Sequence, residues 1–318
     1  MNILEKFQTV IILIAVGAGL LLGQFTLFEQ NAEFFIIPFL LLMLYGLFLA
    51  IPLKDFKDAF KNIRFLNTST IINFVWTPLL AWGLGAIFLA DYPALWLGFI
   101  MFMVTPCTDW YLVFTKIAKG NMSLSTSVLP INLILQMLLI PMYLFIFVGT
   151  MESVSLSTVT KSVVLVLVIP FAMAQLSRYL LKNKRTFLND KLIPFFSSAQ
   201  ILFLALAITA MFASEGSYLI NNLEIILILL IPVLLFFAIN FVVAQTVGKA
   251  LKFSYEDTVS LSLTVIARNS PIALAIVIAA FPDQPLIALV LVIGPLIELP
   301  ILAIVSQILL SLRGNTRK

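Results

Sequence analysis

The chain has 318 residues, of which 62% are hydrophobic and 11% are charged, whereas soluble domains contain about 25% charged residues. This composition excludes most soluble globular classes and intrinsic disorder, and it supplies enough apolar residues for about ten membrane-spanning helices. With 13 glycines, one cysteine and no histidine, the sequence also excludes collagen-like and disulfide-rich folds and lacks the usual proton switch near neutral pH.

Hydrophobic runs separated by short polar breaks predict ten transmembrane helices. A backbone in lipid must satisfy its own hydrogen bonds, and the runs lack the alternating pattern of β-barrel strands, so the prediction is an all-α integral membrane protein. In chain order the runs lie at 7–24, 34–53, 69–90, 94–117, 122–149, 159–181, 192–214, 220–250, 256–281 and 285–312.

The positions of Lys and Arg predict the orientation, because these side chains resist translocation. One face of the predicted bundle collects 17 of the 19 cations, while the loops of the opposite face are acidic and carry Lys161 as their only base. We therefore expect a multi-pass protein of the cell membrane with both termini in the cytoplasm and no nucleic-acid partner. The 17 cations are Lys6, Lys54, Lys57, Lys61, Arg64, Lys116, Lys119, Arg178, Lys182, Lys184, Arg185, Lys191, Lys249, Lys252, Arg313, Arg317 and Lys318.

After the charges near the helix ends have been assigned to the two faces, three charged residues are left inside predicted helices: Asp109, Arg268 and Glu298. A charge at bilayer depth costs at least ~2.5 kcal/mol, so it is rarely kept without a partner or a water-lined cavity. Pro106 precedes Asp109 by three residues, and Pro271 follows Arg268 by three. Proline frees backbone groups that in lipid must face a cavity, an ion or a substrate, so these positions predict broken helices at a midplane site.

The two halves of the chain, 1–158 and 159–318, each contain five predicted helices. An odd number of helices per half makes the halves opposite in orientation, which is the inverted-repeat plan of secondary transporters. When the first half is aligned with the second by adding 159 to its residue numbers, Asp109 corresponds to Arg268 and Pro141 to Pro300. Each half therefore has a charged residue 32 positions before a proline.

Uncharged polar residues also recur on single faces of the predicted helices. Each such stripe, taken alone, is explained by interhelical hydrogen bonds worth ~1 kcal/mol or less. Their convergence with the buried charges favours a functional site. The stripes are Ser260, Thr264 and Arg268; Thr105 and Asp109; Thr70, Asn73 and Thr77; and Asn132 with Gln136.

Two segments resemble the bile acid:sodium symporter superfamily, and within it the arsenical-resistance branch of arsenite exporters. The first is Pro106-Cys107-Thr108 followed through Lys119-Gly120-Asn121, which is similar to the P-C-T segment and the K-G-D or K-G-N end of that branch. The second runs from Ala267-Arg268-Asn269-Ser270 to Gly294-Pro295-Leu296-Ile297-Glu298-Leu299-Pro300, and it is similar to the segments N-N-F-E-L-A and G-P-L-I-E-V-P.

The resemblance implies a panel domain with helices at 7–53 and 159–214 and a core domain with helices at 69–149 and 220–312. In the core, discontinuous helices 4 and 9 would cross, and the substrate would bind beside the crossing. Carried over residue by residue, the resemblance places Cys107, Thr108 and Asp109 at one break, Arg268, Asn269 and Ser270 at the other, and Asn73 at the polar position of helix 3 that helps to hold sodium.

The chain departs from its apparent relatives at two positions of helix 9. Sodium-dependent members have a Glu followed four residues later by Gln-Asn, and here these positions are Thr264, Arg268 and Asn269. The Glu of the arsenite exporters falls on Ile272. We therefore expect the Arg268 guanidinium to lie where sodium would sit, balanced by Asp109 across the crossing and by Glu298, and transport to be independent of sodium.

These residues predict a secondary transporter that exports arsenite or another small solute by alternating access, with Cys107 as a soft metalloid ligand and Asp109 or Glu298 as proton carriers. Two alternatives remain open: an organic-anion carrier in which Arg268 anchors the substrate, and a structural or signalling protein in which Asp109 and Arg268 only join helices.

An enzyme is not expected, since no nucleophile has a histidine base. No cofactor or metal site is predicted, the expected partners are the lipid bilayer and a small-molecule or ion substrate, and the oligomeric state is open. The predicted substrate- or ion-binding residues are Asp109, Arg268, Asn269, Cys107, Thr108, Asn73, Thr264, Ser270, Glu298 and Asn132.

Overall fold

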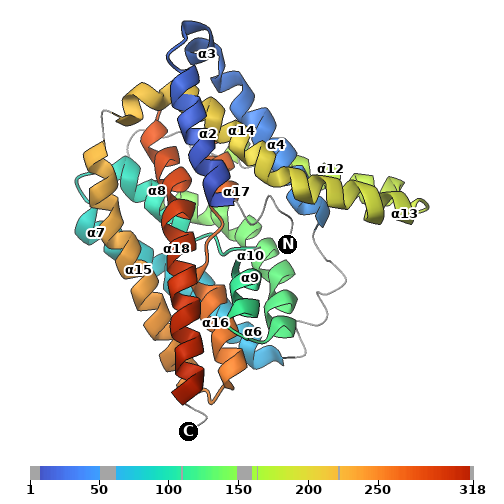
Figure 1. The fold of residues 1–318 in the computed structure, drawn as a ribbon, viewed down its shortest axis with the longest axis vertical. Helices are drawn as coiled ribbons and strands as arrows, with labels where there is room; N and C mark the ends of the chain where they lie inside the picture. The colour runs from blue at the N-terminus through green and yellow to red at the C-terminus, as the bar shows by residue number, and fades with distance from the viewer. Residues whose placement is uncertain are drawn as a thin grey trace. The chain divides into compact units, whose positions relative to one another are not determined.

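The computed structural model of the chain describes residues 8–50, 62–108, 110–148, 160–162, 164–220 and 223–315. All the regular secondary structure of these residues is helical, and an isolated antiparallel β-bridge joins Pro106 to Arg268 (Figure 1). The prediction of an all-α protein is therefore confirmed for the described part of the chain.

Two compact units share the chain. Unit 1 consists of Met1–Ile51, Ser153–Glu224 and Pro271–Val292, and unit 2 consists of Pro52–Glu152, Ile225–Ser270 and Ile293–Lys318. The division into panel and core domains stays a prediction, as do the two inverted repeats, whose boundary between 158 and 159 lies outside the described residues.

Unit 1 is built around the long helix α14, which packs against α2 and α4, while α12 packs against α4. Small residues allow the closest approach: a Cβ atom on Gly19 of α2 would lie 2.6 Å from the carbonyl oxygen of Thr209 on α14. The helices are α2 (Gln8–Leu22), α3 (Thr26–Asn31), α4 (Glu33–Ala50), η4 (Val164–Val168), α12 (Ile169–Leu180), α13 (Arg185–Phe187), η5 (Leu188–Leu192), α14 (Ile193–Ile220) and nearly all of α17 (Ser270–Ala280).

Unit 2 contains both breaks, together with α8, α9 and α16 on their sides. Side-chain caps fix where several of its helices begin: Asn62, Asn121 and Ser254 accept hydrogen bonds from the first-turn amides of α6, α10 and α16. The helices are α6 (Ile63–Ile71), η3 (Ile72–Trp76), α7 (Thr77–Phe88), α8 (Pro93–Met103), α9 (Trp110–Ile117), α10 (Met122–Val148), α15 (Leu223–Ala250), α16 (Tyr255–Ile266) and the larger part of α18 (Pro285–Asn315).

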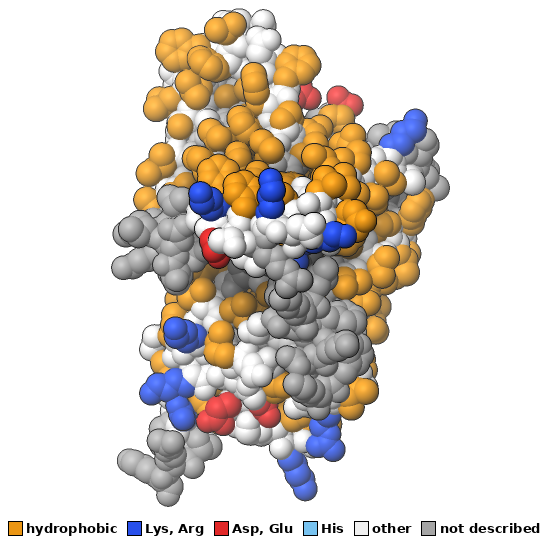
Figure 2. Space-filling model, turned by 90° about the vertical axis from the view of Figure 1, so that its right-hand side faces the viewer, with side chains coloured by type: hydrophobic (Ala, Val, Ile, Leu, Met, Phe, Trp, Pro, Cys, Tyr) orange, Lys and Arg blue, Asp and Glu red, His pale blue; other side chains and the backbone are white. Residues whose placement is uncertain are grey.

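Seven helices among the described residues are long and apolar enough to cross a membrane. Large hydrophobic side chains such as Phe34 and Ile87, which are 77% and 73% exposed, belong to a surface that faces lipid, and Figure 2 shows many such side chains on one face. The protein is therefore a multi-pass membrane protein, while the count of ten spans stays a prediction. The seven spans are Glu33–Ala50, Ile63–Phe88, Met122–Phe147, Thr160–Leu180, Leu188–Ser214, Leu227–Ala250 and Pro285–Arg313.

The predicted helices at 94–117 and 256–281 are both broken. The first is divided into α8 and α9, and the second into α16 and α17 (Figure 1). Both breaks lie where a proline stands close to a polar or charged residue in the sequence, as expected from the loss of a backbone donor.

Candidate functional site

The non-helical segments of the two broken helices pair with each other in unit 2. The backbone N–H of Cys107 donates to the carbonyl oxygen of Ala267 at 2.9 Å, and the N–H of Asn269 donates to the carbonyl oxygen of Thr105 at 2.7 Å. Each break thus satisfies backbone groups that the other has lost from its helix, which a chain in lipid requires. The two segments that are expected to cross are therefore joined by backbone hydrogen bonds, and this paired region is called the crossing below.

Arg268 is 2% exposed and lies at this crossing. Its guanidinium donates from Nε to the carbonyl oxygen of Ile266 at 3.0 Å and from Nη1 to that of Met103 at 2.9 Å. From Nη2 it donates to Oδ1 of Asn73 at 3.2 Å and to the carbonyl oxygen of Val265. These contacts use four of the five guanidinium N–H groups.

The carbonyl acceptors of Arg268 are the exposed ends of two half-helices. Met103 is the last residue of α8, and Val265 and Ile266 are the last two of α16. The final carbonyls of a helix have no intrahelical donor and carry the negative end of its dipole. The guanidinium therefore acts as an internal cation that neutralises both helix ends, and the ring of Phe236, whose centre is 5.5 Å from Cζ, covers it.

Glu298 contacts Arg268 through the backbone rather than the side chain. Its Oε1 atom accepts a 2.8 Å hydrogen bond from the N–H of Arg268, and the carboxylate is 3% exposed. Among the described residues no ion pair includes the Arg268 guanidinium, so Glu298 makes no direct side-chain contact with it, and the balancing of the two charges stays a prediction. The reason is geometric: the guanidinium turns back to the ends of α8 and α16, while the amide faces α18.

The charged pair proposed from the sequence rests on Asp109, which lies outside the described residues. The pairing of Asp109 with Arg268 therefore stays a prediction.

Two side-chain amides extend the network around the crossing. Asn73, in the π-helical turn η3, accepts from Arg268 and donates through Nδ2 to the carbonyl oxygen of Thr264 at 3.5 Å. Asn269 donates through Nδ2 to the hydroxyl oxygen of Thr108 at 3.2 Å, which joins the two breaks by side chains as well as by backbone. π-helical turns are frequent at functional sites, which agrees with the position of Asn73.

The remaining predicted residues are buried but differ in their contacts. Cys107 is 4% exposed and lies in the paired segment. The hydroxyl groups of Thr264 and Ser270 and both polar atoms of Asn132 have no hydrogen-bond partner within the described part of the chain. The structure thus places nine predicted residues in unit 2. Hydrogen bonds join Arg268 to Asn73 and Glu298, Asn73 to Thr264, Asn269 to Thr108, and Cys107 to the neighbouring Ala267.

Sequence reasoning missed most of the atoms that hold Arg268. They are backbone carbonyls of Met103, Val265 and Ile266, and any residue supplies such a group. Phe236 was missed as well, because one aromatic residue in an apolar helix carries no distinguishing pattern. The breaks beside Pro106 and Pro271 were the available signal that carbonyls would be free there.

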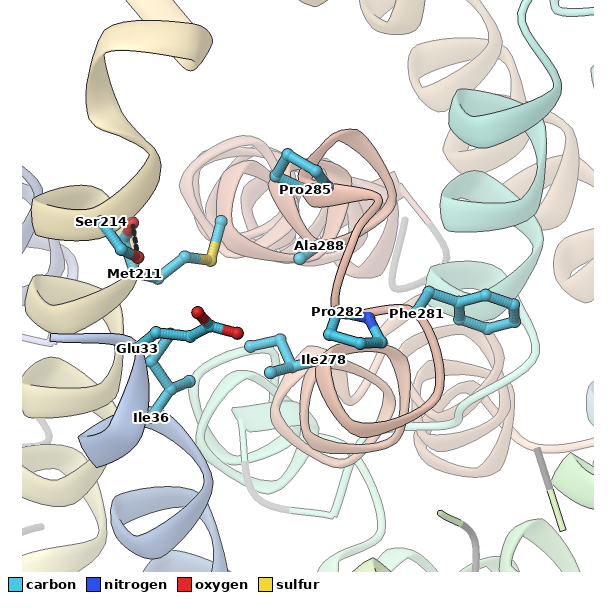
Figure 3. A pocket seen from close by; sticks show the side chains of 9 residues that line it. All are labelled: Glu33, Ile36, Met211, Ser214, Ile278, Phe281, Pro282, Pro285 and Ala288. Carbon is cyan, nitrogen blue, oxygen red and sulfur yellow. Dashed lines mark hydrogen bonds between the residues drawn. The ribbon is translucent and has the colours of Figure 1, made fainter. Parts of the chain in front are cut away.

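A separate pocket lies within unit 1 and contains none of the predicted residues. The carboxylate of Glu33 points into it, and the other walls are almost entirely apolar (Figure 3). The only other polar side chain is Ser214, whose hydroxyl donates to the carbonyl oxygens of Ala210 and Met211 on its own helix. Its lining consists of Glu33, Ile36, Met211, Ser214, Ile278, Phe281, Pro282, Pro285 and Ala288.

The fold and the crossing define a class of protein. Discontinuous membrane helices whose ends surround a buried charge are typical of secondary transporters, where half-helix ends hold substrates and coupling ions. The chain belongs to the Sodium Bile acid symporter family, whose profile matches residues 37–222.

Its similarity to individual members extends over almost the whole chain. It is 25% identical to "Arsenical-resistance protein Acr3" of Corynebacterium glutamicum, with 95% of this chain and 87% of that protein covered. It is 24% identical to "Uncharacterized transporter slr0944" of Synechocystis sp., with 97% and 88% covered. A second "Arsenical-resistance protein Acr3", from Alkaliphilus metalliredigens, is 22% identical, with 96% and 91% covered.

Proposed function

We propose that this transporter exports arsenite or a similar small solute across the cell membrane without sodium. Its family and its relatives make it a transporter, and two relatives named for arsenical resistance support the class of substrate. The observation that carries sodium independence is the Arg268 guanidinium, which is bound by three helix-end carbonyls and the amide of Asn73.

A sodium ion and this guanidinium would compete for the same kind of ligand. In secondary transporters, unwound backbone carbonyls and the C-terminal ends of half-helices coordinate sodium. Here those oxygens already accept hydrogen bonds from a side chain that stays protonated at any physiological pH. The resident cation therefore supports a cycle that needs no sodium.

Cys107 supplies the chemistry that suits a trivalent metalloid. A thiolate is a soft ligand, and Cys107 lies in the paired segment beside Thr108, whose hydroxyl accepts from Asn269. A single thiol provides one soft contact, so the oxygen atoms of the solute would be held by neighbouring hydroxyl and amide groups. Glu298, buried at the same crossing, is our candidate for the group that exchanges a proton during transport.

The geometry gives less support to an organic-anion carrier anchored by Arg268. Four of its five N–H groups already donate to Ile266, Met103, Asn73 and Val265, so a substrate carboxylate would have to displace them. Bidentate anion binding needs two parallel free donors, and the described contacts leave one. A purely structural protein would not require two helices broken at one point.

Arsenite flux in vesicles tests the proposal. Purified protein in proteoliposomes should move arsenite at equal rates in sodium, potassium or choline buffer, and Cys107→Ser should lower the rate at least about tenfold because the soft ligand is lost. Export can be followed by arsenic content after filtration. A flux that requires sodium while Arg268 is intact, or no arsenite flux at all, would contradict it.

A further inference from the structure

Helix α10 carries two buried carboxamides without hydrogen bonds. Asn132 and Gln136 are 1% and 0% exposed, and within the described residues none of their four side-chain nitrogen and oxygen atoms has a partner. The two residues are four apart, so they lie one above the other on one face of the helix. Ser125, whose hydroxyl is also without a partner, lies on the same face two turns earlier.

These side chains belong to the part of unit 2 that surrounds the crossing. α10 packs against α8, α9 and α16, which are three of the four half-helices produced by the two breaks. The two carboxamides thus belong to a helix that packs against the helices on either side of the breaks, and they add neutral polar groups to the charged ones of unit 2.

Buried carboxamides without partners destabilise a membrane protein. Each unsatisfied buried polar group costs about 1–3 kcal/mol in proteins, and lipid offers no replacement partner. Polar residues usually reduce this cost by joining helices. Asn240, which is 0% exposed, does so through its Oδ1 atom, which accepts a 3.2 Å hydrogen bond from Trp76, although its Nδ2 atom has no partner within the described residues. Within the described residues, Asn132 and Gln136 make no side-chain hydrogen bond to another helix, so a structural role does not explain them.

We propose that Asn132 and Gln136 bind the hydroxyl groups of the transported solute, and that this solute is small, uncharged and carries several hydroxyl groups. The inference deepens the transport function proposed above and rests on it. A carboxamide offers two donors and one carbonyl acceptor, which suits hydroxyl groups because these both donate and accept.

The lack of charge on the solute follows from the same groups. An ionised solute bound beside α10 would lose its hydration shell and would meet no opposite charge on Asn132 or Gln136. The free energy cost of that transfer is far larger than the cost of burying a hydroxyl group. The Arg268 guanidinium could pair with such an anion only by giving up its hydrogen bonds to the helix ends. Recognition by neutral groups therefore selects an uncharged solute over its anion.

Boric acid provides a direct test, because it is an uncharged trihydroxy compound that does not bind thiols. The variants Asn132→Leu and Gln136→Met keep the approximate shape of each side chain and remove its polar atoms. We expect boric acid to raise the thermal unfolding temperature of the purified wild-type protein, and either variant to need at least about tenfold more boric acid for the same shift. Without boric acid, both variants should unfold at the same temperature as the wild type or higher.

Asn240→Leu is the matched control. It also removes a buried carboxamide from unit 2, but one whose oxygen accepts a hydrogen bond from Trp76. It should therefore lower the unfolding temperature and leave the boric acid shift unchanged. The inference would be overturned by wild-type protein that shows no boric acid shift, by variants that keep it, or by variants that are less stable without ligand. Boric acid binding through the carboxamides without any arsenite flux would contradict the function proposed above while supporting this inference.

Discussion

At the scale of single residues, the central feature is a fixed cation at the end of two helices. Arg268 is kept in the interior of unit 2 because the helix interruptions expose carbonyl oxygens that need donors. The charge and the helix ends stabilise each other. The guanidinium also fills the space between them in a fixed planar geometry, which Lys would not reproduce.

Arg268→Gln tests this role. Removing the guanidinium leaves the carbonyls of Met103, Val265 and Ile266 without donors, so we expect a loss of about 2–4 kcal/mol in the free energy of unfolding. Because vacated carbonyls at half-helix ends are ligands for sodium, added sodium should restore part of the stability of the variant and have no effect on the wild type. Differential scanning fluorimetry in sodium and choline buffers measures both.

Arg178→Gln is a suitable control for that experiment. Arg178 also donates to a helix-end carbonyl, that of Leu49, but in unit 1. Its loss should lower stability without creating a response to sodium. A sodium response in Arg178→Gln, or none in Arg268→Gln, would show that Arg268 does not occupy a cation site.

At the scale of helices, close packing positions the carboxylate of Glu298. Gly294 lies one turn before it on α18, and a Cβ atom there would be 2.5 Å from the ring of Phe102 on α8. The missing side chain lets the aromatic ring lie against α18, which keeps Glu298 within hydrogen-bond distance of the Arg268 amide. Gly294 belongs to the segment that resembles the G-P-L-I-E-V-P motif, so this part of the motif has a packing explanation.

Gly294→Val should therefore disturb the site through packing. We expect α18 and Phe102 to move apart, the unfolding temperature to fall by several degrees, and arsenite flux to decrease at least about tenfold. Gly83→Val on α7 is the control, because a Cβ atom at Gly83 meets nothing within 4 Å, and it should retain stability and flux. Equal effects of the two substitutions would contradict the proposed packing role.

The broken helices were predictable, but their pairing was only partly so. Pro106 and Pro271 mark the interruptions in the sequence, since each removes a backbone donor from its helix. The register of the paired segments depends on how the helices pack. In this register the amide of Cys107 donates to the carbonyl oxygen of Ala267, and the amide of Asn269 donates to that of Thr105. The resemblance to a family implied the crossing, while composition and spacing alone would have left it open.

At the scale of the whole molecule, the distribution of cations predicts how the chain lies in the membrane. Lys161 is the second residue of the span Thr160–Leu180, and Lys184 lies four residues beyond its end. The positive-inside rule places Lys184 in the cytoplasm and Lys161 on the opposite side. Both side chains are exposed. Each is therefore accessible to a reagent from its own side of the membrane.

Single-cysteine labelling measures this topology. Cys107 is the only cysteine, so Cys107→Ser provides a cysteine-free background. A membrane-impermeant maleimide added to intact cells should label Lys161→Cys fully and should label Lys184→Cys only after the membrane is opened. The reverse pattern would invert the proposed orientation, and labelling of both positions in intact cells would contradict a membrane span between them.

The sequence by itself determined the membrane environment, the helical class, the interruptions and the identity of the buried polar residues. These follow from composition, from the hydrogen-bonding needs of a backbone in lipid and from the rarity of charges at bilayer depth. The tertiary structure decided what those residues contact: Arg268 donates to helix ends, Glu298 accepts from a backbone amide, and Asn132 and Gln136 have no partner among the described residues. The physical reason is that backbone carbonyls act as ligands only where distant helices end side by side, and helix packing fixes that arrangement.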